Sequence, residues 1–455
     1  MGAGKTTLGE ELAAHLGRPF VDVDRELPVA ELFAEHGEEE FRARETEATI
    51  AVLASATPSV VSLGGGAVTS AAVREALRAA ALTLHVPVDV DTAWSRVRGG
   101  DRPLAQDEAS FRTLFEERRP LYLEAADAQA GDRDAAVLAA GGVHVEPGSL
   151  ERLGELVPGG GPVEIVSDAR VAGIYGMDVQ LALGGRSRGI HELPPGEQAK
   201  SVESLQALWH ALRLERSGTL LALGGGCTTD VAGFAAATFM RGIDWVAVPT
   251  TLVGQVDAAI GGKTAVDLPE AKNLVGAFHW PVQTVIDPVT LGTLPEEELA
   301  NGRAEVVKTG LLAGEPLWEL PLPEQVRRCA AFKTAVCLRD PEDRGERSQL
   351  NLGHTFAHAL ETAARFELPH GRAVALGLLA ALRLSGLDTK PVEEQLKPRP
   401  VKVDRDAAWA AMSRDKKVVG GRPRLVLLDA PGKPRVGVEL PPEDVRRALD
   451  ELIAG

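Results

Sequence analysis

The sequence is poor in cysteine and short of positive charge. It has three cysteines, Cys227, Cys329 and Cys337, an odd number without C-x-x-C spacing, which indicates neither a disulfide framework nor a cysteine zinc site. It has 49 basic and 65 acidic residues, which give a formal net charge of −16. This balance argues against general binding to nucleic acid or anionic membranes, while a local basic pocket for a phosphorylated substrate stays compatible with it.

Long apolar runs and targeting segments are also missing. No run is long enough to span a bilayer, and the N-terminus lacks the pattern of a signal peptide. We therefore expect a cytoplasmic protein. A hydrophobic content of 44% with 25% charged residues is typical of a globular protein, and 455 residues predict two to four domains.

Short apolar runs alternate with helical patterns, which predicts an α/β fold. Expected strands lie at 18–24, 58–66, 82–88, 163–168, 219–226, 245–251 and 283–288. From about Pro295 the strands become sparse, and helices are expected at 296–312, 350–366 and 371–386. A stretch rich in glycine and proline places the main boundary near Gly141. We predict four segments: 1–140, a junction at 141–162, an α/β subdomain at 163–295 and a mainly helical subdomain at 296–455.

The chain opens with "MGAGKTT", the second half of a phosphate-binding loop. In such a loop, backbone N–H groups hold a polyphosphate, a lysine balances its charge and a hydroxyl binds Mg²⁺. Gly2, Gly4, Lys5 and Thr6 occupy these positions. Alone, the motif is also compatible with an ordinary glycine-rich helix start.

Further polar motifs follow in the first part. "FVDVD" places Asp22 and Asp24 one residue apart, which predicts one shared strand face. The other motif residues are a glycine run and three arginines: Gly64, Gly65, Gly66, Arg42, Arg102 and Arg118. Singly, each arginine would be read as a surface residue.

Together these motifs resemble the shikimate kinase family over residues 1 to about 138. The resemblance implies ATP and Mg²⁺ at Gly2, Gly4, Lys5 and Thr6, with Asp22 near the metal. It implies that Arg102 lies on a lid over the phosphates. It implies that shikimate contacts Asp24, Arg42, Gly64, Gly65, Gly66 and Arg118.

The strand before the loop and the loop's first glycine are missing from the printed sequence. In the related fold that strand is central, so we expect little or no kinase activity from this chain. We expect that the full protein starts upstream of Met1. The opposing hypothesis is a P-loop module that has lost catalysis.

The second part contains "LGGGCTTD", a buried strand, a glycine turn and a helix start. Such a turn lets the backbone approach a pyrophosphate, although it also fits a plain tight turn. Farther on, His354 and His358 lie four residues apart, and Glu305 and His370 lie in neighbouring motifs. A glutamate with two histidines is a common catalytic zinc set, whereas an isolated histidine pair would be read as core.

These segments resemble the 3-dehydroquinate synthase family over about residues 142–455. The resemblance implies a metal, Zn²⁺ or Co²⁺, at Glu305, His354 and His370. It implies NAD contacts from Asp168, Glu197, Lys200, Gly225, Gly226, Asp230, Thr250 and Thr251. It implies catalytic roles for Lys263, His358, Lys308, Asn351, Arg347 and Asp257. It implies substrate contacts from Arg241, Lys272, Asn273, Lys333 and Lys416.

The two resemblances imply a bifunctional enzyme of the shikimate pathway. The second part would convert 3-deoxy-D-arabino-heptulosonate 7-phosphate to 3-dehydroquinate and phosphate, with a transient oxidation by NAD. Two alternatives stay open, another sugar-phosphate cyclase and a metal-dependent polyol dehydrogenase, although a neutral polyol would not require so many lysines. The partners expected are small molecules, with neither nucleic acid nor membrane, and the family leaves room for a homodimer through the second part.

Overall fold

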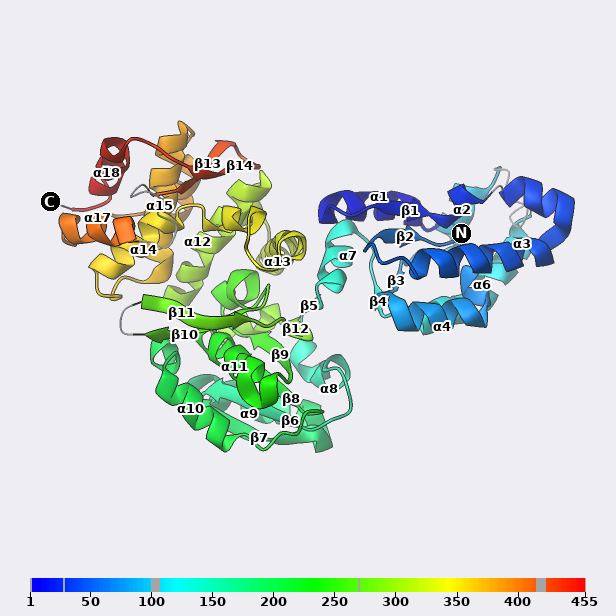
Figure 1. The fold of residues 1–455 in the computed structure, drawn as a ribbon, viewed down its shortest axis with the longest axis horizontal. Coiled ribbons are helices and arrows are strands. Elements are labelled where there is room, and N and C mark those ends of the chain that lie inside the picture. Colours follow the sequence, from blue (N-terminus) through cyan, green and yellow to red (C-terminus); the bar gives the residue numbers. More distant parts are fainter. Residues whose placement is uncertain (1, 28, 100–106, 269–270, 415–422, 455) are drawn as a thin grey trace. The chain divides into compact units, whose positions relative to one another are not determined.

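The structure is a computed structural model that describes residues 2–27, 29–99, 107–268, 271–414 and 423–454. Residues 1–141 and 142–455 form two compact units, which we call the N-terminal and C-terminal units. Figure 1 shows the elements of each unit.

The N-terminal unit contains two short parallel strand pairs. β1 (Phe20–Asp22) pairs with β2 (Val60–Ser62), and β3 (Leu84–His85) pairs with β4 (Ala128–Gln129). Among the described residues of this unit, no strand joins one pair to the other. The helices are α1 (Lys5–Leu16), α2 (Val23–Glu26), α3 (Val29–Leu53), α4 (Ala71–Ala80), α5 (Val90–Val97), α6 (Glu108–Ala125) and α7 (Arg133–Ala140).

The prediction that Asp22 and Asp24 share a strand face is wrong. β1 ends at Asp22, and Asp24 lies in the short helix α2. The Asp22 carboxylate accepts the backbone N–H of Asp24 at 3.1 Å and so caps this helix. An aspartate side chain favours this local hydrogen bond over continued strand pairing, which explains why the strand ends at Asp22 instead of Asp24.

The C-terminal unit contains a six-stranded sheet in which every neighbouring pair is parallel. In spatial order its strands are β5 (Val143–Val145), β12 (Gln283–Ile286), β9 (Asp244–Pro249), β8 (Thr219–Gly224), β6 (Val163–Asp168) and β7 (Ser187–Leu193). Helices cover both faces, as a parallel sheet requires. They are α8 (Leu153–Leu156), α9 (Ala169–Leu183), α10 (Val202–Ala211) and α11 (Gly226–Thr238).

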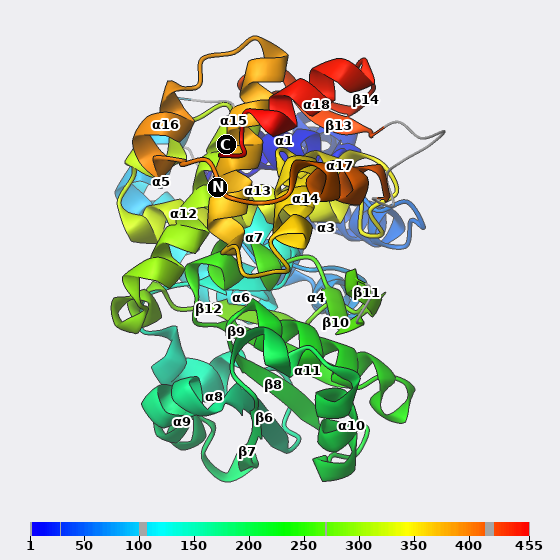
Figure 2. The same cartoon turned by 90° about the vertical axis from the view of Figure 1, so that its left-hand side faces the viewer.

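Successive residues of the central strands point into two different cores. Leu221 of β8 packs with α8 and α9, whereas its neighbours Leu220 and Ala222 pack with α10 and α11. Figure 2 shows α8 and α9 on one side of the sheet and α10 and α11 on the other. This burial on both faces explains why these strands are continuous apolar runs in the sequence.

The strand order reverses between β6 and β8. The chain passes from β6 outward to β7, then returns to β8 and continues through β9 to β12 on the other side. In open α/β sheets, ligands bind in the crevice at the carboxyl ends of the strands that flank such a reversal. Asp168 ends β6 and Gly225 follows β8, so both lie at this edge.

Between β9 and β12 the chain forms an antiparallel hairpin, β10 (Lys263–Leu268) and β11 (Ala271–Phe278), which packs against α11. The helical part follows β12. The helices there are α12 (Glu296–Ala313), α13 (Leu322–Arg339), α14 (His354–Ala363), α15 (His370–Ser385), α16 (Lys390–Leu396), α17 (Arg405–Arg414) and α18 (Pro442–Asp450). They share one core with the hairpin β13 (Leu425–Ala430) and β14 (Lys433–Val438). The predicted fold class, a parallel α/β unit followed by an α/β and a mainly helical part, is confirmed. Within the described residues, no helix is long and apolar enough to cross a membrane.

Candidate active sites

The predicted phosphate loop ends at the start of α1. Gly4 caps this helix with a positive φ of 85°, a conformation that glycine adopts without strain. Lys5 is the first helical residue, and the Thr6 hydroxyl donates to the Asp22 carboxylate at 2.8 Å. The structure therefore brings together Thr6 and Asp22, the two predicted Mg²⁺ contacts, at a helix N-terminus that favours phosphate.

The predicted shikimate contacts gather around the glycine run 64–66. A Cβ on Gly64 would lie 2.6 Å from Asp24 Oδ1, and one on Gly66 would overlap the Arg42 guanidinium. The Gly65 carbonyl accepts a hydrogen bond from Arg118 at 3.2 Å. These glycines are therefore needed for the close approach of the charged groups, and the structure groups all six predicted residues.

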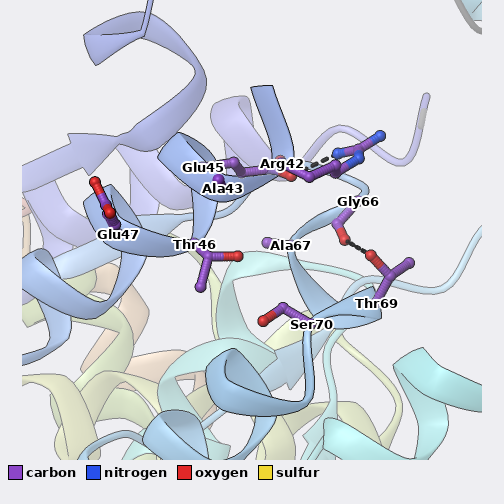
Figure 3. A pocket seen from close by; sticks show the side chains of 9 residues that line it. All are labelled: Arg42, Ala43, Glu45, Thr46, Glu47, Gly66, Ala67, Thr69 and Ser70. Carbon is purple, nitrogen blue, oxygen red and sulfur yellow. Dashed lines mark hydrogen bonds and ion pairs between the residues drawn. The ribbon is translucent and has the colours of Figure 1, made fainter. Parts of the chain in front are cut away.

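Next to this group is a pocket of about 460 Å³. Figure 3 shows Arg42 and Gly66 on its wall, with Glu45 beside Arg42. Glu45 is 2% exposed and forms an ion pair with Arg42. Burial raises the pKa of Glu45, although the Arg42 partner acts against this rise. Sequence reasoning missed Glu45, although its spacing of three from Arg42 within a helical pattern was the available signal.

In the C-terminal unit, the predicted NAD contacts line the carboxyl edge of the sheet. Gly225 caps α11, Thr250 and Thr251 follow β9, and Asp168 ends β6. A Cβ on Gly225 would lie 3.0 Å from the Thr251 side chain, and one on Gly226 would lie 3.1 Å from Ala258. The glycine turn is thus a narrow cradle between β8 and β9.

Five further NAD and substrate candidates form a charged cluster beside this cradle. Lys200 contacts Asp230 at 2.7 Å and also donates to Asn273, and Lys272 contacts Glu197 at 3.3 Å. Burial alone would lower the pKa of Lys200, but Asp230 raises it above its ordinary value. The structure therefore brings these five predicted residues together, with a buried ammonium group at the centre.

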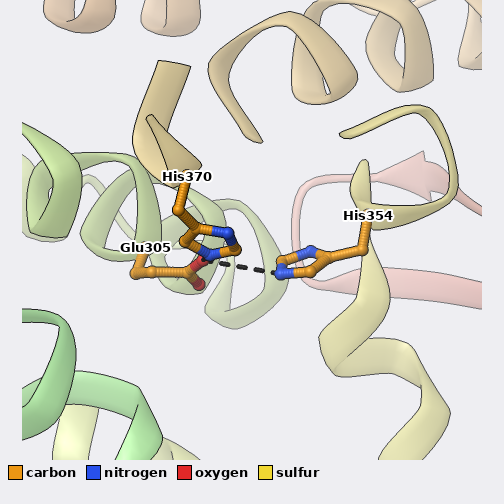
Figure 4. Close-up of side chains that lie close together, drawn as sticks. All are labelled: Glu305, His354 and His370. Carbon is orange, nitrogen blue, oxygen red and sulfur yellow. Dashed lines mark hydrogen bonds and ion pairs between the residues drawn. The ribbon is translucent and has the colours of Figure 1, made fainter. Parts of the chain in front are cut away.

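Three helices bring the predicted metal ligands together. Glu305 lies in α12, His354 begins α14 and His370 begins α15, and their ligand atoms all lie within 4.8 Å of one another. The Nε2 atoms of His354 and His370 lie 3.5 and 3.1 Å from Glu305 Oε1. Figure 4 shows both rings directed at this carboxylate.

The three residues differ in charge. Burial holds the pKa of His354 well below its ordinary value, so this ring is neutral at pH 7. Burial would also lower the pKa of His370, but Glu305 and Glu361 raise it to about 10. Burial would raise the pKa of Glu305, but Lys308 and the histidines hold it well below its usual range. The metal-free set thus holds a carboxylate, a neutral imidazole and a protonated imidazole, and His370 would release its Nε2 proton when it binds a metal.

Glycines allow the ligand-bearing helices to approach closely. Gly353 has a φ of 77°, and a Cβ there would lie 2.7 Å from the backbone nitrogen of Leu378 in α15. Gly371 donates its backbone N–H to the Asn301 side chain of α12 at 3.1 Å. A Cβ on Gly371 would overlap the Asn301 backbone, and one on Gly377 would overlap that of Gly353.

Buried charges lie beside the metal set. Lys308 forms ion pairs with Glu305 and with Asp257, the latter at 3.4 Å. Lys333 donates to the Asp257 carbonyl at 2.6 Å and contacts its carboxylate. Burial would raise the pKa of Asp257, but Lys308 and Lys333 hold it below its ordinary value. Asp257 itself lies in a π-helical turn, a feature frequent at functional sites.

Other predicted residues already have protein partners. Lys263 is half-exposed and pairs with Asp343. The buried Arg347 donates to the carbonyls of Gly261 at 2.8 Å and Pro341 at 2.9 Å. Asn351 donates to the Ser348 carbonyl at 3.0 Å.

The last predicted residues are His358, Arg241, Arg102 and Lys416. The ring of His358 lies edge-on to that of His354, with centroids 5.4 Å apart. Arg241 is exposed and lies beyond the C-terminal end of α11, the opposite end of that helix from the glycine turn. Arg102 and Lys416 lie outside the described residues.

The parallel sheet has a glycine cradle where its strand order reverses, and the helical subdomain that follows holds a glutamate and two histidines. This combination defines the class of the C-terminal unit as a metal-dependent cyclase or dehydrogenase. Comparison with known proteins separates these classes. Residues 1–142 match the family model of shikimate kinase, residues 190–301 that of the 3-dehydroquinate synthase N-terminal domain, and residues 302–418 that of its C-terminal domain.

Two relatives and one solved structure illustrate the similarity. The 3-dehydroquinate synthase of Bordetella pertussis is 39% identical over 345 residues, which cover 68% of this chain and 95% of the relative. That of Gloeobacter violaceus is 42% identical over 344 residues, with the same shares. The structure of 2-epi-5-epi-valiolone synthase from Streptomyces hygroscopicus subsp. jinggangensis, with NAD⁺ and Zn²⁺ bound, is 27% identical with a TM-score of 0.62, over 68% of this chain and 96% of that one.

The chain belongs to the 3-dehydroquinate synthase family. It carries a shikimate kinase unit ahead of the synthase and is therefore a bifunctional enzyme of the shikimate pathway.

Proposed function

We propose that the C-terminal unit makes 3-dehydroquinate and phosphate from 3-deoxy-D-arabino-heptulosonate 7-phosphate, with NAD and a divalent metal. The convergence of Glu305, His354 and His370 from three helices carries this proposal. Three protein ligands that leave further positions open are typical of catalytic zinc, and Co²⁺ accepts the same donors. The solved cyclase that contains NAD⁺ and Zn²⁺ supports this choice.

The glycine cradle supports NAD as the second cofactor. Side chains at 225 and 226 would fill the space between β8 and β9, and the N-terminus of α11 favours a pyrophosphate there. We assign Asp168, Glu197, Lys200, Asp230, Thr250 and Thr251 to the same cofactor. Separate apolar cores support the proposed subdomains 163–295 and 296–455. Lys272 lies 4.7 Å from the ring centroid of Phe366, which links the hairpin to the helical part.

When bound, NAD accepts and returns a hydride and the metal polarises a substrate hydroxyl. The chain's own residues then have three tasks. We assign Lys263, Lys272, Asn273, Arg241 and Lys416 to the carboxylate and phosphate of the substrate, because paired anions call for cations inside an acidic protein. We assign proton handling to His358, which adjoins the His354 ring. Lys308, Lys333, Arg347 and Asn351 hold Asp257 and the surrounding loops in place.

For the N-terminal unit, we assign ATP and Mg²⁺ to Gly2, Gly4, Lys5, Thr6 and Asp22, and we assign Arg102 to the same phosphates. The direct hydrogen bond between Thr6 and Asp22 supports a shared cation site. Asp24 orients the attacking hydroxyl, and Arg42 and Arg118 hold the substrate carboxylate beside the glycine run 64–66.

A phosphate-release assay with the seven-carbon sugar acid phosphate and NAD tests the synthase assignment. We expect phosphate release that a chelator abolishes and added Zn²⁺ or Co²⁺ restores. Full activity in metal-free enzyme would contradict the metal set. Steady accumulation of NADH would favour a dehydrogenase.

We also infer a homodimer through the C-terminal unit and a cytoplasmic location. Helix α9 supports the first inference, because Ile174, Met177 and Leu181 are 43%, 69% and 71% exposed at helical spacing. The three cysteines support the second, because none is in a disulfide. Light scattering after size-exclusion chromatography tests the dimer, and a monomeric mass would contradict it.

A further inference from the structure

The imidazole ring of His370 lies between two carboxylates. Its Nε2 atom lies 3.1 Å from Glu305 Oε1, and its Nδ1 atom lies 3.0 Å from Glu361 Oε1. Glu361 is 7% exposed and lies in α14, whereas His370 begins α15. The carboxylate of one helix thus holds the ring that the next helix supplies.

His354 is held in the same way by a different acceptor. Its Nδ1 atom lies 3.2 Å from the Leu352 carbonyl oxygen. A carbonyl only accepts, so Nδ1 carries the proton and Nε2 keeps its lone pair toward Glu305. In both rings, therefore, Nδ1 is occupied by an acceptor and Nε2 faces the centre of the metal set.

We propose that Glu361 is a positioning residue for the metal. It accepts the Nδ1–H of His370 and so fixes the orientation of this ring. Nε2 is then the nitrogen left to bind the metal. A carboxylate acceptor also makes the imidazole a more basic ligand than a carbonyl does. This inference rests on the proposed function, because it assumes that Glu305, His354 and His370 bind a divalent metal.

The position of Glu361 in α14 gives it this role. His354, His358 and Glu361 are spaced by four and three residues, so they lie along one face of the helix. The same helix thus supplies one ligand directly and orients another. A shift of α14 relative to α15 would disturb both histidines at once.

Three variants of the full chain test the proposal. Glu361→Gln keeps the shape and a neutral acceptor, Glu361→Ala removes the acceptor, and Glu367→Gln changes an exposed glutamate between the same two helices. The probes are Zn²⁺ affinity, from competition with a chromophoric chelator, and the visible absorption spectrum of the Co²⁺-loaded protein. Circular dichroism of the metal-free proteins checks the fold.

We expect Glu361→Gln to bind Zn²⁺ about tenfold more weakly and Glu361→Ala up to about 100-fold more weakly, the range for loss of a partner behind a ligand. Both should change the Co²⁺ spectrum, and Glu367→Gln should change neither readout. If Glu361→Ala does not fold, the isosteric Glu361→Gln decides.

Affinity within twofold of the unchanged protein and an unchanged Co²⁺ spectrum would overturn the proposal, even if the variants melt at a lower temperature. Failure of the unchanged protein to bind one metal ion would instead overturn the proposed function.

Discussion

Replacement of His354 by alanine separates metal binding from other roles of the histidines. The imidazole is 8% exposed and its Nδ1–H donates to the Leu352 carbonyl. Without metal, the variant leaves this buried acceptor without its donor, which costs about 1–3 kcal/mol of stability. We expect a larger loss of stability in the presence of metal, because the variant also loses a metal ligand.

The free energy that a bound ligand adds to the folded state is RT ln(1 + [L]/Kd). At a free Zn²⁺ concentration 100 times Kd, this is about 2.7 kcal/mol. Loss of a hydrogen-bond partner of a metal ligand weakens metal binding about 10–100-fold. We therefore expect loss of a ligand itself to weaken metal binding at least about 100-fold. At the same Zn²⁺ concentration the gain then falls to about 0.4 kcal/mol.

The assay is urea unfolding with buffered Zn²⁺ and with a chelator, together with phosphate release. The matched control is His358→Ala, because this ring adjoins His354 on the same helix but lies outside the ligand set. We expect His358→Ala to keep the Zn²⁺-dependent stabilisation while it lowers turnover. A His354→Ala protein with the full Zn²⁺-dependent stabilisation would refute the ligand assignment.

Three further predictions concern other parts of the chain. Lys263→Ala should lower the synthase kcat/KM at least about tenfold, whereas the exposed Lys402→Ala should not; equal values for both variants would make Lys263 a plain surface charge. Burial, with the charge of Glu197, raises the pKa of the Cys227 thiol to about 12, so the thiol stays protonated at pH 8. Iodoacetamide should therefore label Cys227 only after denaturation. Rapid labelling of the native protein would contradict this environment. The chain as printed should phosphorylate shikimate only slowly, because no strand among the described residues joins β1–β2 to β3–β4; rapid ADP release with shikimate in a coupled assay would show that the prediction is wrong.

The central strands of the six-stranded sheet were predictable from sequence for a simple physical reason. Strands buried on both faces, such as 219–224, are continuous apolar runs, and glycines mark the turn that follows. Glu305, His354 and His370 were singled out by the resemblance to the synthase family, since α12 carries other charged residues and α14 carries a second histidine, His358. Apolar runs and glycine turns therefore indicate the strands, whereas the motifs shared with the family indicate the ligand set.

Pairings between distant segments were not predictable in the same way. Nothing local in the sequence indicates that Lys263 meets Asp343, or that Glu361 supports His370 across two helices. Asp24 shows a different limit, since a carboxylate cap at Asp22 outweighed the strand pattern. Such contacts depend on tertiary packing, which brings together residues that the sequence separates.

The close approach of α12, α14 and α15 at Gly353, Gly371 and Gly377 limits how this protein can change over evolutionary time. An alanine at 371 would press against the Asn301 backbone, and one at 377 against Gly353. Each would move a ligand-bearing helix without altering a ligand. In a library of single substitutions, these three positions should therefore be as intolerant as the ligands themselves, and a survey of sequence variation alone would mistake them for contacts to the metal.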